Sequence, residues 1–354
     1  MKRFLASSVI GWSMMTGIWA ASDDKTVEDQ LEKDGSWSLS LYFENDMFAS
    51  TDQQYTNGTK ISWVSPDVAE YVHTSFPYLT EYIDREVKFL SRGYDHKNLA
   101  FSIGQNMYTP EDIATTELLE DDRPYAAWLY IGTGFHAKSH RVQDTLEIQL
   151  GVIGPAALGK EIQDLVHELR GIPKANGWHN QLQNELGLNL VGERRVRLEP
   201  DNTGHGWETD AIASGGIVLG NVSTYVNLGI EGRVGYNLPQ DFGTTHIRPG
   251  GETNIPFLDE RNRFESYRGE QDYGVLFFAS VEGRAIARDI FLDGNTFRSS
   301  HSVSKEPLVA DFAAGIKFKI RSFKVSYSQV RRTKQFKMQP EAHTFGSLMV
   351  SFAY

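Results

Sequence analysis

The chain has 354 residues, no cysteine, a net charge of −11 and a negative mean hydropathy. The lack of cysteine excludes disulfides and thiolate chemistry, and the negative charge argues against a nucleic-acid-binding protein. Aromatic residues nevertheless make up 12% of the chain. A polar average with many aromatic residues is typical of a transmembrane β-barrel, because only alternate residues of each strand face lipid.

Residues 1–21 are predicted to be a secretory signal peptide. Lys2 and Arg3 precede a mostly apolar stretch that closes on small residues. A membrane anchor is the alternative, but Ser and Gly interrupt the stretch. No other run approaches the roughly 18 apolar residues of a membrane helix. Residues 22–354 are therefore predicted to form a single exported domain.

Most of the remaining chain shows the alternation of a β-strand, in which every second residue is apolar. About twelve such segments are found, an even number, as expected for a bacterial barrel. They are residues 37–44, 55–63, 99–104, 125–137, 145–152, 184–198, 210–219, 223–234, 273–287, 308–320, 323–330 and 344–354. The predicted fold is all-β: a transmembrane antiparallel β-barrel with a short active-site helix.

That helix is predicted within residues 151–178, where the spacing changes. Pro155 occupies a favourable first position, and Gly171 marks the end. An apolar stripe at helical spacing is formed by Leu158, Ile162, Leu165, Val166 and Leu169. Gln163 and His167 lie on the opposite, polar face. His167 is either a functional group or a solvated surface histidine, and the helix alone does not decide between them.

Two polar clusters are predicted to meet at one rim of the barrel. Asn45 and Asp46 end one strand, and Thr56 begins the next. A short connection would gather their oxygen atoms, which are the ligands that Ca²⁺ prefers. The alternative is ordinary turn chemistry, since Asn, Asp and Thr are favoured in turns for backbone reasons.

Two further polar residues are candidates for substrate contacts. Asn106 lies in the segment QNMYTP, and Arg123 lies in DDRPY. Arg123 beside two carboxylates has the alternative role of a structural ion pair. The chain contains no G-x-S-x-G elbow, no H-E-x-x-H zinc motif and no phosphate-binding glycine loop.

Four ordered motifs carry a resemblance to a known family. FENDMF with YTNG, QNMYTP, DDRPYAAWLYIG, and GVIGPAALGKEIQDLVHELRG followed by GW together resemble the outer-membrane lipid A 3′-O-deacylases. The resemblance covers most of the mature chain and implies a twelve-stranded barrel in the bacterial outer membrane. It also implies an active site between a short helix and the barrel wall. The substrate would be lipid A of lipopolysaccharide, whose ester-linked 3′ acyloxyacyl group would be hydrolysed with Ca²⁺.

Residue by residue, the family histidine falls on His167 and the glutamine one turn earlier on Gln163. The asparagine–aspartate pair falls on Asn45 and Asp46, and the threonine on Thr56. Water activated by His167 would then be the nucleophile, with Ca²⁺ polarising the ester carbonyl.

The chain also departs from the family pattern at four positions. Met47, Thr115, Pro173 and Ala175 stand where the best-described form has an aspartate, a lysine, an acid and a tyrosine. These departures motivate the alternative of a non-enzymatic barrel, a channel or surface protein. A phospholipase is a further alternative, but its expected serine cannot be placed.

The carboxyl end is predicted to be a terminal strand. Leu348, Val350, Phe352 and Tyr354 alternate with less apolar or small residues, and the chain stops on the aromatic. This pattern resembles the strand that outer-membrane barrels present to the barrel assembly machinery. A soluble β-sandwich could end on a similar strand.

Overall fold

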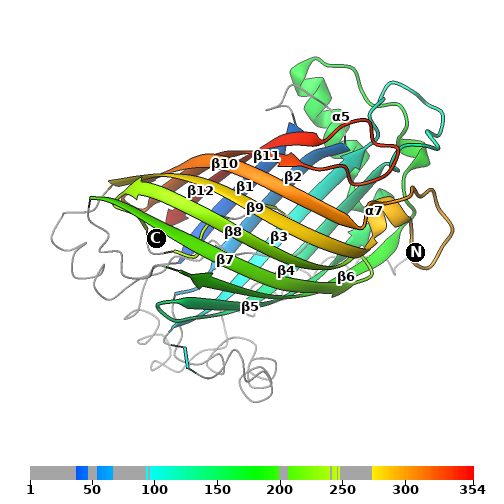
Figure 1. Cartoon of the computed structure of the whole chain (residues 1–354). Helices are drawn as coiled ribbons and strands as arrows, with labels where there is room; N and C mark the ends of the chain where they lie inside the picture. The colour runs from blue at the N-terminus through cyan, green and yellow to red at the C-terminus, as the bar shows by residue number, and fades with distance from the viewer. Residues whose placement is uncertain are drawn as a thin grey trace, which may run out of the picture.

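The computed structural model describes residues 37–46, 54–66, 93–94, 96–198, 206–239, 241–244, 246–247 and 273–354. Twelve strands form one closed antiparallel barrel (Figure 1). They are β1 (Ser38–Asn45), β2 (Gln54–Val64), β3 (His96–Thr109), β4 (Ala126–Lys138), β5 (Val142–Ile153), β6 (Glu185–Arg197), β7 (Trp207–Gly220), β8 (Ser223–Tyr236), β9 (Tyr273–Asp289), β10 (Leu308–Ile320), β11 (Phe323–Arg332) and β12 (His343–Ala353). The predicted barrel and its strand count are confirmed. The predicted signal peptide lies outside the described residues.

Every strand pairs with its sequence neighbours, and β1 closes the barrel against β12, with Ser38 opposite Ala353 and Asn45 opposite Gly346. Because the strands alternate in direction, β1 begins and β12 ends at the same end of the barrel. The connection between β5 and β6, which carries the helix α5 (Gly159–Arg170), is at the other end. Figure 1 shows α5 at the right and the C-terminus at the left.

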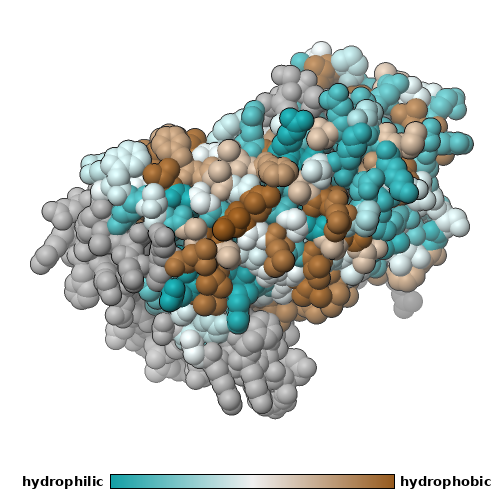
Figure 2. Space-filling model, viewed as in Figure 1, coloured by the Kyte–Doolittle hydropathy of each residue, from teal (hydrophilic) through white to brown (hydrophobic). Residues whose placement is uncertain are grey.

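The outer wall is apolar where alternate side chains leave the barrel. On β8, Val226, Leu228 and Ile230 are exposed, while the residues between them are more enclosed. Figure 2 shows such side chains gathered on the middle of the visible wall, with hydrophilic residues towards the helix-bearing end. At the end away from α5, Trp207 and Tyr273 flank Tyr236, with ring centroids 6.2 and 6.1 Å from it. An apolar belt with aromatic residues at its border matches a lipid-facing surface.

The lumen is filled by side chains at the end that carries α5. Its apolar cluster contains Tyr55, Tyr108, Trp128, Tyr130, Ile290, Phe291, Val330 and Phe345, among others. The short helix α7 (Ile290–Asp293) contributes Phe291, whose ring stacks on Tyr108 at 4.1 Å. Residues from strands on opposite sides of the barrel therefore meet at its centre.

A segment of the β8–β9 connection also enters the lumen. We call residues 241–244 and 246–247 the lumen plug. Arg197 donates to the carbonyl of Asp241, whose carboxylate pairs with Arg233 and Lys317. These three basic residues come from β6, β8 and β10, so the plug contacts several walls of the lumen.

The helical segment differs in detail from the prediction. Pro155 begins a short 3₁₀ turn, η3 (Pro155–Ala157), and α5 starts only after Leu158, whose φ is 59°. The helix ends at Gly171, as predicted, in a left-handed conformation with φ of 66°. Among the described residues, no helix combines the length and apolar character that crossing a bilayer would require.

Candidate functional site on the outer wall

The predicted rim residues lie together where β1, β2 and β3 approach α5's end of the barrel. Asn45 Nδ2 donates to the Thr56 carbonyl at 2.8 Å, and Thr56 Oγ1 lies 2.7 Å from Thr109 Oγ1. Thr56 is the extra residue of a β-bulge, since Tyr55 pairs with Tyr108 and Asn57 already pairs with Met107. A bulge re-aims a side chain, which here brings Thr56 to Thr109. Asp46, the residue after Asn45, is fully buried.

Asn45 faces the outside of the barrel. It starts a row of paired outward residues that continues through Asn57 on β2 and Met107 on β3 to Ala127 on β4. At the end of this row, a Cβ added to Gly159 would come within 2.5 Å of the Ala127 Cβ. The absence of a side chain at Gly159 therefore lets the start of α5 lie directly on the outer wall.

Two buried amides hold this helical segment in place. Gln105 Nε2 donates to the Ala157 carbonyl at 2.6 Å, which ties the turn before α5 to β3. Trp178 Nε1 donates to Gln163 Oε1 at 2.6 Å, and both side chains are buried. Trp178 packs in one cluster with Met107 and Ala127, so the predicted residue Gln163 is linked to the outward row.

His167 lies one turn after Gln163 and is only 3% exposed, so the interpretation as a solvated surface histidine is wrong. Its Nδ1 lies 2.6 Å from the Pro173 carbonyl oxygen. A carbonyl can only accept, so Nδ1 carries the hydrogen. In the neutral ring the lone pair is then on Nε2, the nitrogen suited to take up a proton.

The orientation of α5 is the reverse of that in a soluble protein. Gly159, Gln163 and His167 are its buried residues, whereas Leu165 is 57% and Leu169 78% exposed. The buried side of the helix therefore carries the polar side chains Gln163 and His167, while its exposed side carries leucines together with charged residues such as Lys160. Near the start of α5, an ion pair between Lys160 and Asp164 raises the pKa of the lysine.

Asn106 and Arg123 are not brought to this outer site. Asn106 alternates with Gly104 and Tyr108 and therefore faces the lumen, where its amide atoms have no partner among the described residues. Arg123 lies over the Tyr108 ring and donates to Gln335 Oε1 at 3.1 Å. The barrel wall separates Asn106 from the outer site, because one residue along a strand decides the face. Arg123 lies before β4 and is held on the lumen side by its contact with the lumen-facing Tyr108.

The donor atoms at the rim have the character of a calcium site. Asp46 would supply a carboxylate, and Asn45 and Thr56 would supply amide, hydroxyl and carbonyl oxygens. These are all hard ligands of the type Ca²⁺ prefers. No group of three His, Cys, Asp or Glu side chains suited to a metal ion occurs within the described part of the chain. The set therefore fits an oxygen-rich calcium site with a single carboxylate.

Sequence analysis missed several residues of this site. Thr109 and Trp178 hold the predicted residues Thr56 and Gln163 in place. Gln105 holds the turn before α5, and the carbonyl of Pro173 orients His167. The signal for Gln105 and Thr109 was present, since both are outward positions of β3 at even spacing. A backbone acceptor such as Pro173 leaves no signal in residue type.

Comparisons with known proteins show a similarity to a family of outer membrane proteins. A model of the family described as "Outer membrane protein LpxR" matches residues 5–354. Among solved structures, LpxR from Salmonella typhimurium has 19% identity and a TM-score of 0.69 over 90% of this chain and 100% of that chain. The β domain of the Bordetella autotransporter Brka has 10% identity and a TM-score of 0.40, over 90% and 98% of the two chains. No curated protein matches the chain.

Proposed function

Because the chain belongs to the LpxR family of outer membrane proteins, we propose that it is a lipid A 3′-O-deacylase of the outer membrane. The reaction is hydrolysis of the ester that links the 3′ acyloxyacyl group to lipid A. The family resemblance supports this substrate. The observation that carries the proposal is His167, a buried histidine on the wall-facing side of α5 whose Nδ1 is bound to a carbonyl.

In this proposal His167 is the general base. Its Nε2 takes a proton from water, the water oxygen bonds to the ester carbonyl carbon, and the bond from that carbon to the sugar oxygen breaks. The proton on Nε2 passes to the departing sugar oxygen. The Pro173 carbonyl keeps Nδ1 protonated and stabilises the imidazolium that forms in between, as a carboxylate does in other hydrolases.

Asn45, Asp46 and Thr56 would hold the calcium ion. Bound there, Ca²⁺ would supply Lewis-acid polarisation of the ester carbonyl. The Thr56–Thr109 contact and the Asn45–Thr56 bond keep these oxygens in one place before any ion arrives. Such preorganisation limits the rearrangement that binding would cost.

The helix α5 is long enough to reach the rim residue Asn45 from Ala127. Three interstrand steps separate Asn45 from Ala127, about 14 Å. The twelve residues of α5 extend about 18 Å. A helix that starts at Ala127 is therefore long enough to span β3, β2 and β1. We propose that α5 runs in that direction, with His167 towards its far end.

The apolar stripe of α5 gives the acyl chains a surface. Leu158, Ile162, Leu165 and Leu169 are exposed on a helix beside the apolar outer wall. We propose that the chains of lipid A lie against this stripe while the ester enters between α5 and the wall.

A channel is the second candidate function, and the lumen disfavours it. Aromatic residues from several strands and the lumen plug occupy the interior of the described barrel. The candidate site also lies on the outer wall, where a channel has no need of a buried, oriented histidine.

The test is mass spectrometry of lipid A from cells that express the chain. We expect loss of the 3′ acyloxyacyl mass with the parent, and an unchanged spectrum with His167→Ala. His140→Ala is the matched control, because His140 is exposed in the β4–β5 turn at the other end of the barrel. An unchanged spectrum with the folded parent would refute the proposed function. Activity of His167→Ala near that of the parent would refute the role of the base, which normally contributes about 10²–10⁴-fold in rate.

A further inference from the structure

Glu44 lies on the lumen side of the wall, directly behind the outer site. It precedes Asn45 on β1, and because strand residues alternate, its side chain points inward where that of Asn45 points outward. Glu44 is fully buried and pairs with Gly58 on β2 and Ser347 on β12.

The Glu44 carboxylate joins three other parts of the chain. Oε1 accepts from the Ile247 amide of the lumen plug at 2.6 Å and from Ser347 Oγ at 2.9 Å. Oε2 accepts from Tyr55 Oη at 3.0 Å. Tyr55 immediately precedes Thr56, as Glu44 precedes Asn45. The Glu44 carboxylate therefore links β1 and β2 directly beside the two residues whose oxygen atoms lie at the outer site.

We propose that Glu44 is a positioning residue, which connects the lumen plug to the outer site and fixes the spacing of Asn45 and Thr56. The turnover measurement that tests this inference rests on the proposed function. On the outside, Asn45 and Thr56 are joined directly by the Asn45 Nδ2 bond. On the lumen side, the bond from Tyr55 to Glu44 links the same two strands.

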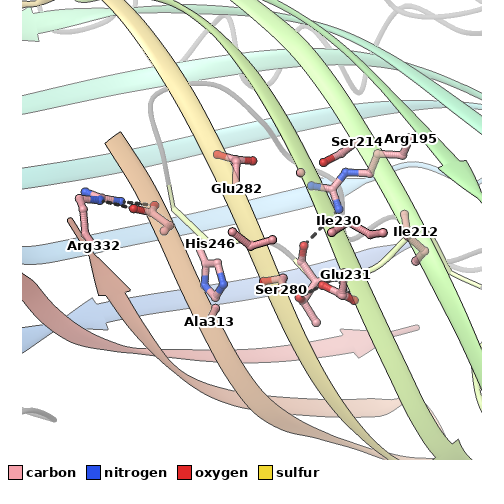
Figure 3. Close-up of a pocket in the computed structure, with 14 residues that line it drawn as sticks. Arg195, Ile212, Ser214, Ile230, Glu231, His246, Ser280, Glu282, Ala313 and Arg332 are labelled. Carbon is pink, nitrogen blue, oxygen red and sulfur yellow. Dashed lines mark hydrogen bonds and ion pairs between the residues drawn. The ribbon is translucent and has the colours of Figure 1, made fainter. Parts of the chain in front are cut away.

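The plug reaches Glu44 from the far end of the barrel. β8 ends and β9 begins at the end opposite α5, and Glu44 is the penultimate residue of β1, near α5's end. Figure 3 shows His246 of the plug in the lumen with Glu231 of β8 and Arg332 of β11 around it. His246 Nδ1 lies 3.8 Å from Glu44 Oε1.

Glu231 provides a matched control. Its carboxylate accepts from the Thr244 amide at 3.1 and 3.2 Å, so it holds the same plug, but from β8 rather than β1. Loss of Glu231 loosens the plug and leaves the Ile247–Glu44–Tyr55 connections in place. A general effect of the plug on stability would make the two glutamates equivalent. A positioning role would not.

The experiment compares Glu44→Ala, Glu44→Gln, Tyr55→Phe and Glu231→Ala in the full chain, in detergent, each checked for folding by heat-modifiable migration. Hydrogen–deuterium exchange is measured at the described rim residues 43–46 and 54–59, and turnover is measured on lipid A. We expect Glu44→Ala to speed rim exchange and lower turnover, each by about tenfold, since small displacements at a reacting centre are costly. Glu44→Gln, which keeps the shape and an acceptor oxygen, should recover most of both. Glu231→Ala should change turnover and rim exchange less than about twofold.

Equal rim exchange in folded Glu44→Ala and Glu231→Ala would overturn the inference, as would undiminished turnover in folded Glu44→Ala. If Glu44→Ala does not fold, Tyr55→Phe decides, since it removes one donor to Glu44 and should still speed rim exchange about twofold or more. A parent that folds but never deacylates lipid A would refute the proposed function alone. The exchange comparison would then still decide the role of Glu44.

Discussion

Trp178→Phe should detach α5 locally without unfolding the barrel. The substitution removes the indole donor and leaves Gln163 Oε1 buried without its 2.6 Å partner. An orphaned buried acceptor costs about 1–3 kcal/mol, which corresponds to about 5- to 140-fold faster local opening. The twelve-stranded barrel does not depend on this bond, so its heat-modifiable migration should stay unchanged.

The assay is hydrogen–deuterium exchange of the α5 amides, with a double-mutant cycle to separate the bond from the loss of ring volume. Gln163→Leu combined with Trp178→Phe replaces both polar partners with apolar groups, so the double variant should open more slowly than Trp178→Phe alone. Exchange of α5 in Trp178→Phe at the parent rate would refute the reasoning. Strictly additive effects in the cycle would show that the hydrogen bond contributes nothing.

Three further predictions concern the same site. Gly159→Ala should lower turnover, because the added Cβ would meet Ala127 at 2.5 Å and Trp178 at 2.8 Å. This holds although alanine is more favourable than glycine in a helix by about 1 kcal/mol. Turnover equal to or above that of the parent would contradict the prediction. Asp46→Asn should raise the free Ca²⁺ needed for half-maximal turnover by about tenfold, because it removes the only carboxylate of the proposed set, and superimposable calcium titrations would count against a metal role. The double variant Leu165→Gln, Leu169→Gln should slow deacylation of lipid A in vesicles by up to about tenfold. Glu168→Gln is the exposed control on the same helix. Equal rates for the double variant and this control would exclude the acyl-chain surface.

The barrel could be predicted from sequence because its signal is repeated in every strand. Alternation sets which residues face lipid, and β6 and β8 keep it over nearly their whole length. The helix was also identifiable, since Gly171 ends it as predicted. Its start was not, because Leu158 adopts a left-handed conformation that its residue type disfavours.

The site was harder to predict because its geometry depends on the face of each strand. Asn45 and Asn106 look equivalent in sequence, yet the first faces outward and the second faces the lumen. The bulge at Thr56 shifts the register by one residue, and the residue types around it do not show which residue is the extra one. Long-range bonds such as Trp178 to Gln163 depend on the folded chain, so the roles of those residues could not be derived from spacing.

The position of the seam between β1 and β12 has a consequence for the timing of activity. Asn45 pairs with Gly346, and Glu44 with Ser347, across strands that are about 300 residues apart in the chain. Contacts between such distant segments are among the slowest to form during folding. The proposed calcium ligands therefore reach their final geometry only when the cylinder closes. The proposed activity would therefore begin only once the barrel has closed in the outer membrane.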